Sequence, residues 1–427
     1  MNSEETRKMG YKKKNILALK CMVCGKEYDP DEIDYVCPEH GLRGNLDVIY
    51  DYDWIRESLT KQGLEKNPDP SMWRYLDLLP ILESRFIPPL RIGGTPLLRA
   101  KRLEDKLGLN ELWIKDDGQN PTGSYKDRAS AIGVIKALEK NKKAICCASS
   151  GNAASSLAGV SASAGLESYL FVPETAPEAK IVQMLVFGAH VMLVKGTYDQ
   201  AYDLSLEAVK KYDWYCRNSG YNPYLSEGKK TGIIEICEQL NWDPPDNIIV
   251  AVGDGCIIGG VWKGIKDLMS LGFIEKAPKI FGVQAEGASP LVNAWKSNTE
   301  KVSALTKLDT IADSISVGDP KDAVKALRAV YETRGEYVSV SDSEISEAMR
   351  VLARGVGVFG EPAAAAAFAG LLKLKRQDKI GQDDRSVVMI TGNGLKDITG
   401  AKNGLEKPQV ILPDLSSLNT FFSSINE

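Results

Sequence analysis

After residue 96 the sequence alternates short apolar runs with longer stretches of helical periodicity, and this alternation constrains the fold. Each apolar run is rich in β-forming residues and ends at a glycine, a proline or a polar turn, as buried strands do. Strands separated by helices of this length indicate parallel sheets with right-handed crossovers, so we expect an α/β fold. The predicted strands are residues 112–115, 144–148, 168–172, 191–194, 248–252, 280–283 and 387–390, and two predicted helices cover about 125–140 and 153–164.

Composition and charge exclude several classes of protein. The chain has two histidines, His40 and His190, which are too few for a Ser-His-Asp hydrolase or a catalytic zinc site with several histidine ligands. We interpret His190, at the start of a predicted strand, as a partly buried strand residue. A net charge of −4 and a pI near 5.6 give no general attraction to nucleic acids or anionic membranes, so neither is an expected partner.

The sequence also predicts a cytoplasmic protein. The first twenty residues are crowded with charges and lack an apolar segment with a cleavage site. The longest apolar stretch, residues 362–372, is too short and too alanine-rich to cross a bilayer. Several of the eight cysteines fall within apolar runs, so we expect packing residues or metal ligands rather than disulfides.

Ligands of parallel sheets bind beyond the carboxyl ends of the strands, where four polar or glycine-rich loops lie in this sequence. The first loop leads into a helix and places Lys126 in its first turn. The positive end of the helix dipole disfavours an ammonium there and lowers the pKa of the lysine, which favours attack of the amine on an aldehyde. The alternative is a solvated lysine that pairs with Asp127.

The second loop, residues 149–153, offers free backbone amides at a helix N-terminus, which suits a carboxylate. Asn152 can donate a hydrogen bond to a cofactor oxygen, although an ordinary helix cap is the alternative. In the third loop, glycines within 253–260 allow amides to approach a phosphate, without the spacing of a dinucleotide fingerprint or a P-loop. In the fourth, the Thr391 hydroxyl can bond a pyridine nitrogen. Plain glycine-rich turns are the alternative for both.

Four such loops with one lysine among them fit a single ligand. In these segments the sequence resembles the fold-type-II pyridoxal-phosphate enzymes, the tryptophan synthase β-like family, and within that family the threonine synthases. The resemblance runs from about residue 90 to residue 397. The matching segments are residues 94–97, 120–128, 149–152, 222–223, 227–231, 357–362 and 391–396.

The resemblance implies a role for each candidate residue. Lys126 is the catalytic lysine that binds pyridoxal 5'-phosphate as a Schiff base, Asn152 contacts the ring hydroxyl of the cofactor, and Thr391 faces the pyridine nitrogen. Other residues are expected to bind the cofactor phosphate or the substrate. The phosphate loop comprises Gly253, Asp254, Gly255, Cys256 and Ile257, the substrate carboxylate would contact Ser149, Ser150 and Gly151, and Lys180 is a candidate for the substrate phosphate.

The implied reaction converts O-phosphohomoserine and water to threonine and phosphate. Two features depart from the family: Leu225 stands where an arginine for the substrate phosphate is common, and residues 253–256 replace an asparagine-bearing cofactor loop. Leu225 keeps a rival open, namely a β-eliminating or β-replacing enzyme such as a serine or threonine ammonia-lyase, or an O-phosphoserine-dependent synthase such as cysteate synthase. A catalytically silent scaffold is a further alternative, against which the retained lysine and loops argue.

The front of the chain carries a second candidate site. Cys21 and Cys24 are followed after twelve residues by Cys37 and His40, which is the spacing of a zinc ribbon with a closed structural site. Related synthases often begin with such a ribbon, usually with four cysteines. The alternative is a ribbon fold without metal.

The resemblance also implies the domain organisation. Residues 1–50 would form the zinc-ribbon-like module, residues 51–124 and 216–427 the large cofactor-binding domain, and residues 125–215 a smaller inserted α/β domain. The cofactor would lie in the cleft between the two parallel-sheet domains, and the small-molecule substrate would close it. A homodimer is expected from the habit of the family.

Overall fold

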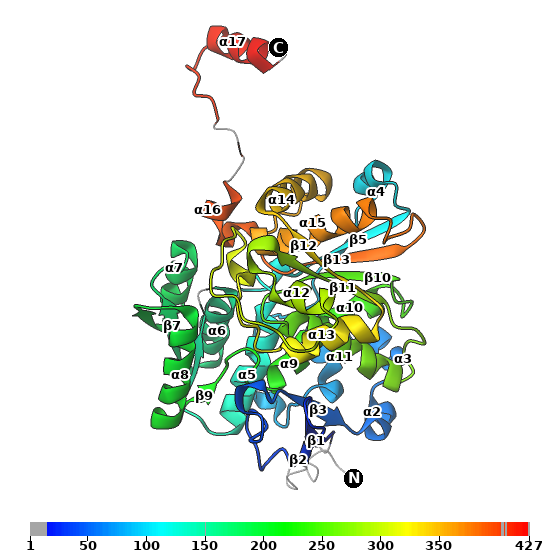
Figure 1. The fold of residues 1–427 in the computed structure, drawn as a ribbon, viewed down its shortest axis with the longest axis vertical. Helices are drawn as coiled ribbons and strands as arrows, with labels where there is room; N and C mark the ends of the chain where they lie inside the picture. Colours follow the sequence, from blue (N-terminus) through cyan, green and yellow to red (C-terminus); the bar gives the residue numbers. More distant parts are fainter. Residues whose placement is uncertain (1–14, 150, 403–404, 406–407, 426–427) are drawn as a thin grey trace.

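The computed structural model describes residues 15–149, 151–402, 405 and 408–425 and is an α/β fold with parallel-rich sheets (Figure 1). Its largest sheet has six strands in the order β12-β11-β10-β13-β5-β4, all parallel except the edge strand β4, which runs antiparallel to β5. The strands are β4 (Leu97–Arg99), β5 (Glu111–Asp116), β10 (Asn247–Ala251), β11 (Lys279–Ala285), β12 (Tyr337–Val340) and β13 (Arg385–Ile390).

The central strand β10 shows why this sheet is covered on both faces. Ile248 and Val250 belong to one buried cluster, whereas the alternate residues Ile249 and Ala251 belong to another. Because successive side chains point to opposite faces, a strand that is apolar throughout needs helices on both sides. The helices of this part are α4 (Lys101–Leu107), α9 (Tyr224–Lys229), α10 (Thr231–Gln239), α11 (Cys256–Ser270), α12 (Pro290–Lys296), α13 (Ala323–Glu332), α14 (Asp342–Val356), α15 (Pro362–Arg376) and α16 (Ile398–Ala401).

Helix α15 shows how local sequence positions a helix on the sheet. Pro362 stands at its first position, where the missing N–H costs nothing, and five buried alanines follow at residues 363–367. The small side chains let the helix pack closely on β10 and β13. The expectation that this alanine run is a helix interior is confirmed.

A second, fully parallel sheet has four strands in the order β8-β7-β6-β9. Its strands and helices lie together at the left of Figure 1, and α5, which precedes them in the chain, packs on both α6 and α9. The elements are α5 (Lys126–Glu139), β6 (Ala144–Ala148), α6 (Asn152–Ala164), β7 (Glu167–Pro173), α7 (Glu178–Val186), β8 (His190–Val194), α8 (Tyr198–Tyr212) and β9 (Tyr215–Cys216).

All seven predicted strands are present, and no end is shifted by more than two residues. The interpretation of His190 as partly buried is wrong. It begins β8, an edge strand, and its side chain is exposed and stacks on Tyr169 at 4.5 Å between ring centroids. An edge strand has a neighbour on one side only, so its first residue is left open to solvent.

The third sheet belongs to the front of the chain and is antiparallel, in the order β2-β1-β3. Its strands are β1 (Ile16–Cys21), β2 (Glu27–Tyr28) and β3 (Leu46–Tyr50), and two short helices follow, α2 (Tyr52–Ser58) and α3 (Lys61–Lys66). The 3-10 helices are η1 (Gly41–Arg43), η2 (Met72–Leu78, kinked at Tyr75), η3 (Ser84–Phe86), η4 (Asp117–Gln119), η5 (Glu286–Ala288), η6 (Asp313–Ile315) and η7 (Gly394–Lys396), and the last helix is α17 (Leu415–Ile425).

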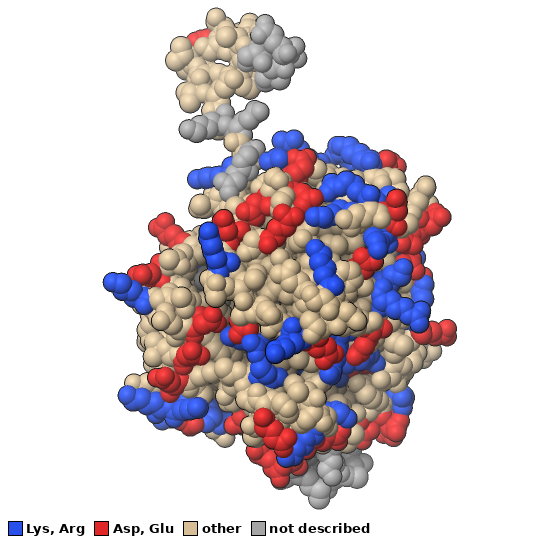
Figure 2. Space-filling model, viewed as in Figure 1, with Lys and Arg blue, Asp and Glu red and all other residues tan. Residues whose placement is uncertain are grey.

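The surface and the cysteines agree with the expectations from composition. On the face shown in Figure 2, basic and acidic side chains are intermixed. Among the helices of the described residues, none combines the length and apolarity needed to cross a bilayer. All eight cysteines lie in the described part of the chain and all are free thiols, so the prediction that they form no disulfide framework is confirmed.

Candidate active site

The loops that follow β5, β6, β10 and β13 all contribute residues to the lining of one cavity. A backbone hydrogen bond from Tyr125 N to Thr391 O (2.9 Å) holds two of these loops side by side. The predicted residues that line the cavity are Lys126, Ser149, Gly151, Asn152, Gly253, Asp254, Gly255, Cys256, Ile257 and Thr391. Ser150, predicted to contact the substrate carboxylate, lies outside the described residues.

Lys126 is the first residue of α5 and its partly buried side chain lines the cavity. The pKa of its amine is lowered, first by burial and next by the positive charge of Arg217. The predicted direction is therefore right, but the causes found are burial and Arg217 rather than the helix dipole that we expected. The alternative pairing with Asp127 is wrong, because that fully buried carboxylate accepts hydrogen bonds from Thr122 N (2.8 Å) and Thr122 Oγ1 (2.5 Å).

The glycine turn before α11 presents a helix N-terminus to the cavity. Gly255 caps the helix with φ of 91° and without a side-chain hydrogen bond, so the first-turn amides of α11 keep their donors. A Cβ on Gly255 would lie 2.6 Å from Ala326 Cβ and 2.9 Å from Asp322 O, so the turn has no room for a side chain. Asp254 fixes it from behind, since its Oδ1 accepts from Lys321 N (3.3 Å).

The loop before α6 presents a second helix N-terminus. Gly151 caps this helix without a side-chain hydrogen bond, so the alternative of an ordinary serine or asparagine cap is wrong. Ser149 Oγ accepts from Gly151 N (3.0 Å) and shapes the loop. Asn152 Nδ2 donates to Glu361 Oε1 (2.6 Å), and its buried Oδ1 has no hydrogen-bond partner among the residues that the structure describes. An unpaired buried amide oxygen indicates a site that expects a further polar group.

Lys180 does not line the cavity directly but lies behind one of its walls. Its fully buried ammonium donates to Asp313 Oδ2 (2.9 Å) and Ser314 Oγ (3.0 Å), and both of these residues line the cavity. Burial alone would lower the pKa of Lys180, but the carboxylates of Glu361 and Asp313 raise it. Lys180 is therefore a charged group held by acceptors of the protein itself.

Sequence reasoning missed part of the cavity wall. The segment 313–317, Tyr198 and Ser219 also line the cavity. None of them directly follows a predicted strand or belongs to a glycine-rich motif, so the rule that found the other loops had no signal there. Glu361, another lining residue, stands in the matching segment 357–362, and that was the signal available for it.

The residues present fit pyridoxal phosphate. A glycine turn at a helix start suits its phosphate, an amine of lowered pKa suits its aldehyde, and the unpaired amide oxygen of Asn152 and the Thr391 hydroxyl are polar groups for the ring. The fold and this cavity define a pyridoxal-phosphate-dependent enzyme of fold type II.

Comparisons with known proteins identify the family. Residues 89–392 match the family described as "Pyridoxal-phosphate dependent enzyme". The chain is 41% identical over 407 residues to threonine synthase of Methanocaldococcus jannaschii, covering 95% of this chain and 99% of that one. It is 39% identical over 401 residues to threonine synthase of Methanosarcina acetivorans, covering 94% and 97%. A solved L-serine ammonia-lyase of Rhizomucor miehei has the same fold, with a TM-score of 0.64, 22% identity and coverage of 72% and 96%. The chain therefore belongs to the pyridoxal-phosphate-dependent enzymes and, among these, to the threonine synthases.

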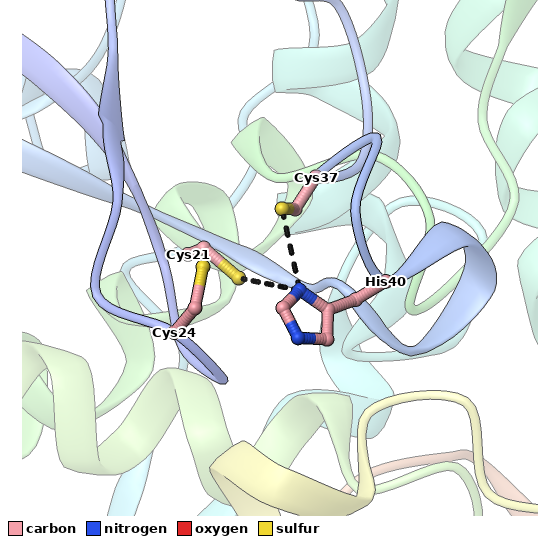
Figure 3. A group of neighbouring side chains, drawn as sticks. All are labelled: Cys21, Cys24, Cys37 and His40. Atoms are coloured by element: carbon pink, nitrogen blue, oxygen red, sulfur yellow. Dashed lines mark hydrogen bonds between the residues drawn. The ribbon is translucent and has the colours of Figure 1, made fainter.

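The four predicted metal ligands also come together, in a part of the chain that precedes all the residues lining this cavity. Cys21 and Cys24 come from the end of β1 and the following turn, and Cys37 and His40 from the loop before η1 (Figure 3). Their ligand atoms all lie within 4.8 Å of one another, and His40 Nδ1 is 3.5 Å from Cys37 Sγ. Three sulfurs and one imidazole in this arrangement are compatible with a closed structural zinc site.

Proposed function

We propose that this chain converts O-phosphohomoserine and water to threonine and phosphate. The observation that carries the proposal is the 41% identity to a threonine synthase over 99% of that protein's length. The cavity supports it, because the Lys126 amine, the glycine turn before α11 and the start of α6 open into one space.

Lys126 would do the acid-base work. Bound pyridoxal phosphate supplies an electron sink for the carbanion at the substrate α-carbon. With the substrate amine held at the cofactor, Nζ of Lys126 would accept the α-proton, pass that proton on and then, neutral again, accept a β-proton. The two protons would end on the α- and γ-carbons of the product, while the second proton of the added water would go to the departing phosphate. The lowered pKa of Lys126 supports this role, because a neutral amine is the form that accepts protons. Water then adds at the β-carbon after phosphate has left the γ-carbon.

The other predicted residues would orient the two ligands. The amides of residues 253–257 would hold the cofactor phosphate, Asn152 the ring hydroxyl and Thr391 the pyridine nitrogen. Ser149, Ser150 and Gly151 would hold the substrate carboxylate at the start of α6. Because Thr391 offers a neutral hydroxyl, it leaves the electron sink weaker than a carboxylate would. The contact of Lys180 with the substrate phosphate stays a prediction, and it requires the ammonium to leave Asp313.

The test is a panel of four substrates given separately to the purified holoenzyme. With O-phosphohomoserine, O-phosphoserine, threonine and serine, release of phosphate, ammonia and keto acid is measured together with threonine formation. Phosphate and threonine from the first substrate alone support the proposal. Ammonia or keto acid from serine or threonine, or phosphate from O-phosphoserine alone, would replace it with the elimination or replacement chemistry that the buried, apolar Leu225 favours.

The finer features of the organisation are proposals as well. We propose a cytoplasmic homodimer in which residues 1–50 form a zinc-binding ribbon. Residues 51–124 and 216–427 would form the large domain and residues 125–215 the inserted domain. The strand order supports this division, since β4 and β5 precede the four-stranded sheet and β10 to β13 follow it. Strand β9 (Tyr215–Cys216) belongs to the four-stranded sheet, so this sheet extends one residue beyond the second boundary.

A further inference from the structure

Two buried cations beside the cavity have no carboxylate partner among the described residues. Arg217 follows β9 and is fully buried; its Nε donates to Ser130 Oγ and its Nη1 to Ser219 Oγ, both at 3.2 Å, while Nη2 has no hydrogen-bond partner. Lys229, the last residue of α9, is 1% exposed, and its ammonium forms no hydrogen bond or ion pair within the part of the chain that the structure describes.

Most other buried lysines of the described residues pair with a carboxylate, and Lys396, which does not, donates its hydrogen bonds to Thr122 O, Ser155 Oγ and Gln183 Oε1. In the described part of the chain, Lys229 lacks both kinds of partner. Lys230, the next residue, lies 2.5 Å from Glu227 Oε2 and 2.6 Å from Asp267 Oδ2. Lys115 lies 2.9 Å from Glu235 Oε2. A buried charge without a counter-charge is costly, so an unpaired pair of cations indicates an anion that the protein alone does not supply.

Both cations lie near the cavity, although neither is among the residues that line it. Ser219, which accepts from Arg217, lines the cavity, and Lys229 packs against α11, where a Cβ on Gly260 would lie 2.7 Å from Lys229 Cβ. The pKa of Lys229 is lowered to about 8, chiefly by burial and also by the charges of Arg217 and Lys126, whereas Cys256 and Asp322 act in the opposite direction. Asp322 nevertheless forms no ion pair with Lys229.

The two cations lie near Leu225, a residue that carries no charge itself. The side chains of Leu225 and Arg217 flank Gly133 of α5, at 3.2 Å and 3.5 Å from the position of a Cβ there. The amides at the start of α11 can satisfy one phosphate, whereas the proposed reaction brings two phosphate monoesters into the cavity, one on the cofactor and one on the substrate.

We propose that Arg217 and Lys229 bind the phosphate group of a phosphorylated amino-acid substrate, beside but separate from the cofactor phosphate at α11. This inference rests on the proposed function and deepens it, because it assigns the residues that select a phosphorylated substrate. Arginine and lysine in a water-poor pocket are the usual ligands of a phosphate dianion.

The experiment is calorimetric titration of the holoenzyme with inorganic phosphate, together with KM for O-phosphohomoserine. Lys229→Gln is expected to weaken phosphate binding and to raise KM by about ten-fold, because a charged hydrogen bond is lost. Lys229→Arg restores both values, and Arg217→Lys, which keeps its charge, has a smaller effect. The matched control is Lys136→Gln, which neutralises a buried lysine that pairs with Glu139 at 2.7 Å; it leaves both values unchanged.

The cofactor is the other source of phosphate, so its affinity is measured on the same variants by visible absorbance. Weaker cofactor binding with unchanged binding of inorganic phosphate to the holoenzyme overturns the inference, and so does the absence of any change or of phosphate binding. The proposed function is judged separately by threonine formation in the unchanged enzyme. Phosphate binding that depends on Lys229, without threonine formation, would contradict the proposed function but would still support the inference.

Discussion

Asn152 donates a hydrogen bond from Nδ2 to Glu361 Oε1 at 2.6 Å, and this bond joins the starts of two helices that belong to different sheets. Asn152 begins α6 beside the four-stranded sheet, whereas Glu361 precedes α15, which packs on the six-stranded sheet. Lys180 of α7 lies 3.9 Å from Glu361 Oε2. One buried carboxylate therefore connects both flanks of the cavity.

Replacing that carboxylate tests whether the connection matters for turnover. Glu361→Ala removes the charged acceptor of the Asn152 amide and leaves only the longer bond to Ser314 Oγ (3.4 Å), so kcat/KM is expected to fall by about 10- to 100-fold, the value of a buried hydrogen bond to a charged group. Cofactor binding should persist, because the glycine turn before α11 is untouched. The control is Glu336→Ala, whose carboxylate pairs with the exposed Lys379. Full turnover in Glu361→Ala would show that Asn152 needs no such support.

Lys126→Ala is expected to abolish threonine formation and the visible absorbance that the lysine-bound cofactor gives. The reason is that the first turn of α5 offers no other amine that could form the covalent bond with the cofactor. Steady-state assays and an absorbance spectrum check both effects. The surface variant Lys142→Ala, which removes a pair with Asp213, serves as the control. An active Lys126→Ala enzyme with an unchanged spectrum would rule out the assigned role.

The unpaired Lys229 predicts a pH dependence of stability in the apoprotein. Its folded pKa is about 8 against an ordinary value of 10.5. Between these values the unfolded chain binds more protons, so this lysine makes stability rise with pH in that range. Below pH 8 the buried ammonium destabilises the fold. Lys229→Gln should therefore raise Tm at pH 7, and the gain should shrink toward pH 10.5.

That measurement needs phosphate-free buffer, since phosphate would supply the missing counter-charge. Thermal unfolding of both proteins at several pH values gives the difference directly. Lys136→Gln, which loses a paired lysine, should show no gain at pH 7. A Tm difference for Lys229→Gln that is constant with pH would mean that Lys229 is not an unpaired buried charge.

The fold was predictable where strands are continuous apolar runs, as in β6 and β10, because burial on both faces leaves a plain signal. Strand β12 (Tyr337–Val340) was missed because a serine interrupts it, and β9 because it has two residues. Strands β1 to β3 were hidden in the cysteine-rich module. Their pairing is set by contacts between distant residues, which local patterns do not contain.

The candidate site also has a part that the sequence predicts and a part that it does not. Lys126, Asn152 and Thr391 could be predicted from their loops at strand ends, because topology brings the carboxyl ends of parallel strands together. The unpaired state of Arg217 and Lys229 could not be predicted, since Lys229 and Lys230 look equivalent in the sequence. Only packing decides that Lys230 meets two carboxylates and Lys229 none.

We expect the module formed by residues 1–50 to bind zinc. The purified protein should contain one zinc ion per chain, and Cys24→Ser should lose it, because a structural zinc site needs four ligands. Elemental analysis measures the metal, and thermal unfolding should show a lower Tm after chelation. Cys237→Ser is the matched control, as this thiol is fully buried in α10 away from the cluster and its variant should keep the zinc. A metal-free protein with unchanged Tm would favour a ribbon without metal.

The glycine turn before α11 gives the sharpest separation between stability and cofactor binding. Gly255 has φ of 91°, and a Cβ there would lie 2.6 Å from Ala326 Cβ. Gly255→Ala must therefore shift the turn whose amides are proposed to hold the cofactor phosphate, and cofactor affinity should fall by about ten-fold or more.

Gly272 supplies the matched control for Gly255→Ala. It also has a positive φ, 72°, but nothing lies within 4 Å of its Cβ position. Gly272→Ala therefore carries a similar backbone strain of about 1 kcal/mol without a collision. Titration of each apoprotein with pyridoxal phosphate, followed by absorbance, compares the two. Because the variants share their strain and differ in the displaced turn, equal cofactor affinities would show that the amides before α11 do not hold the cofactor phosphate.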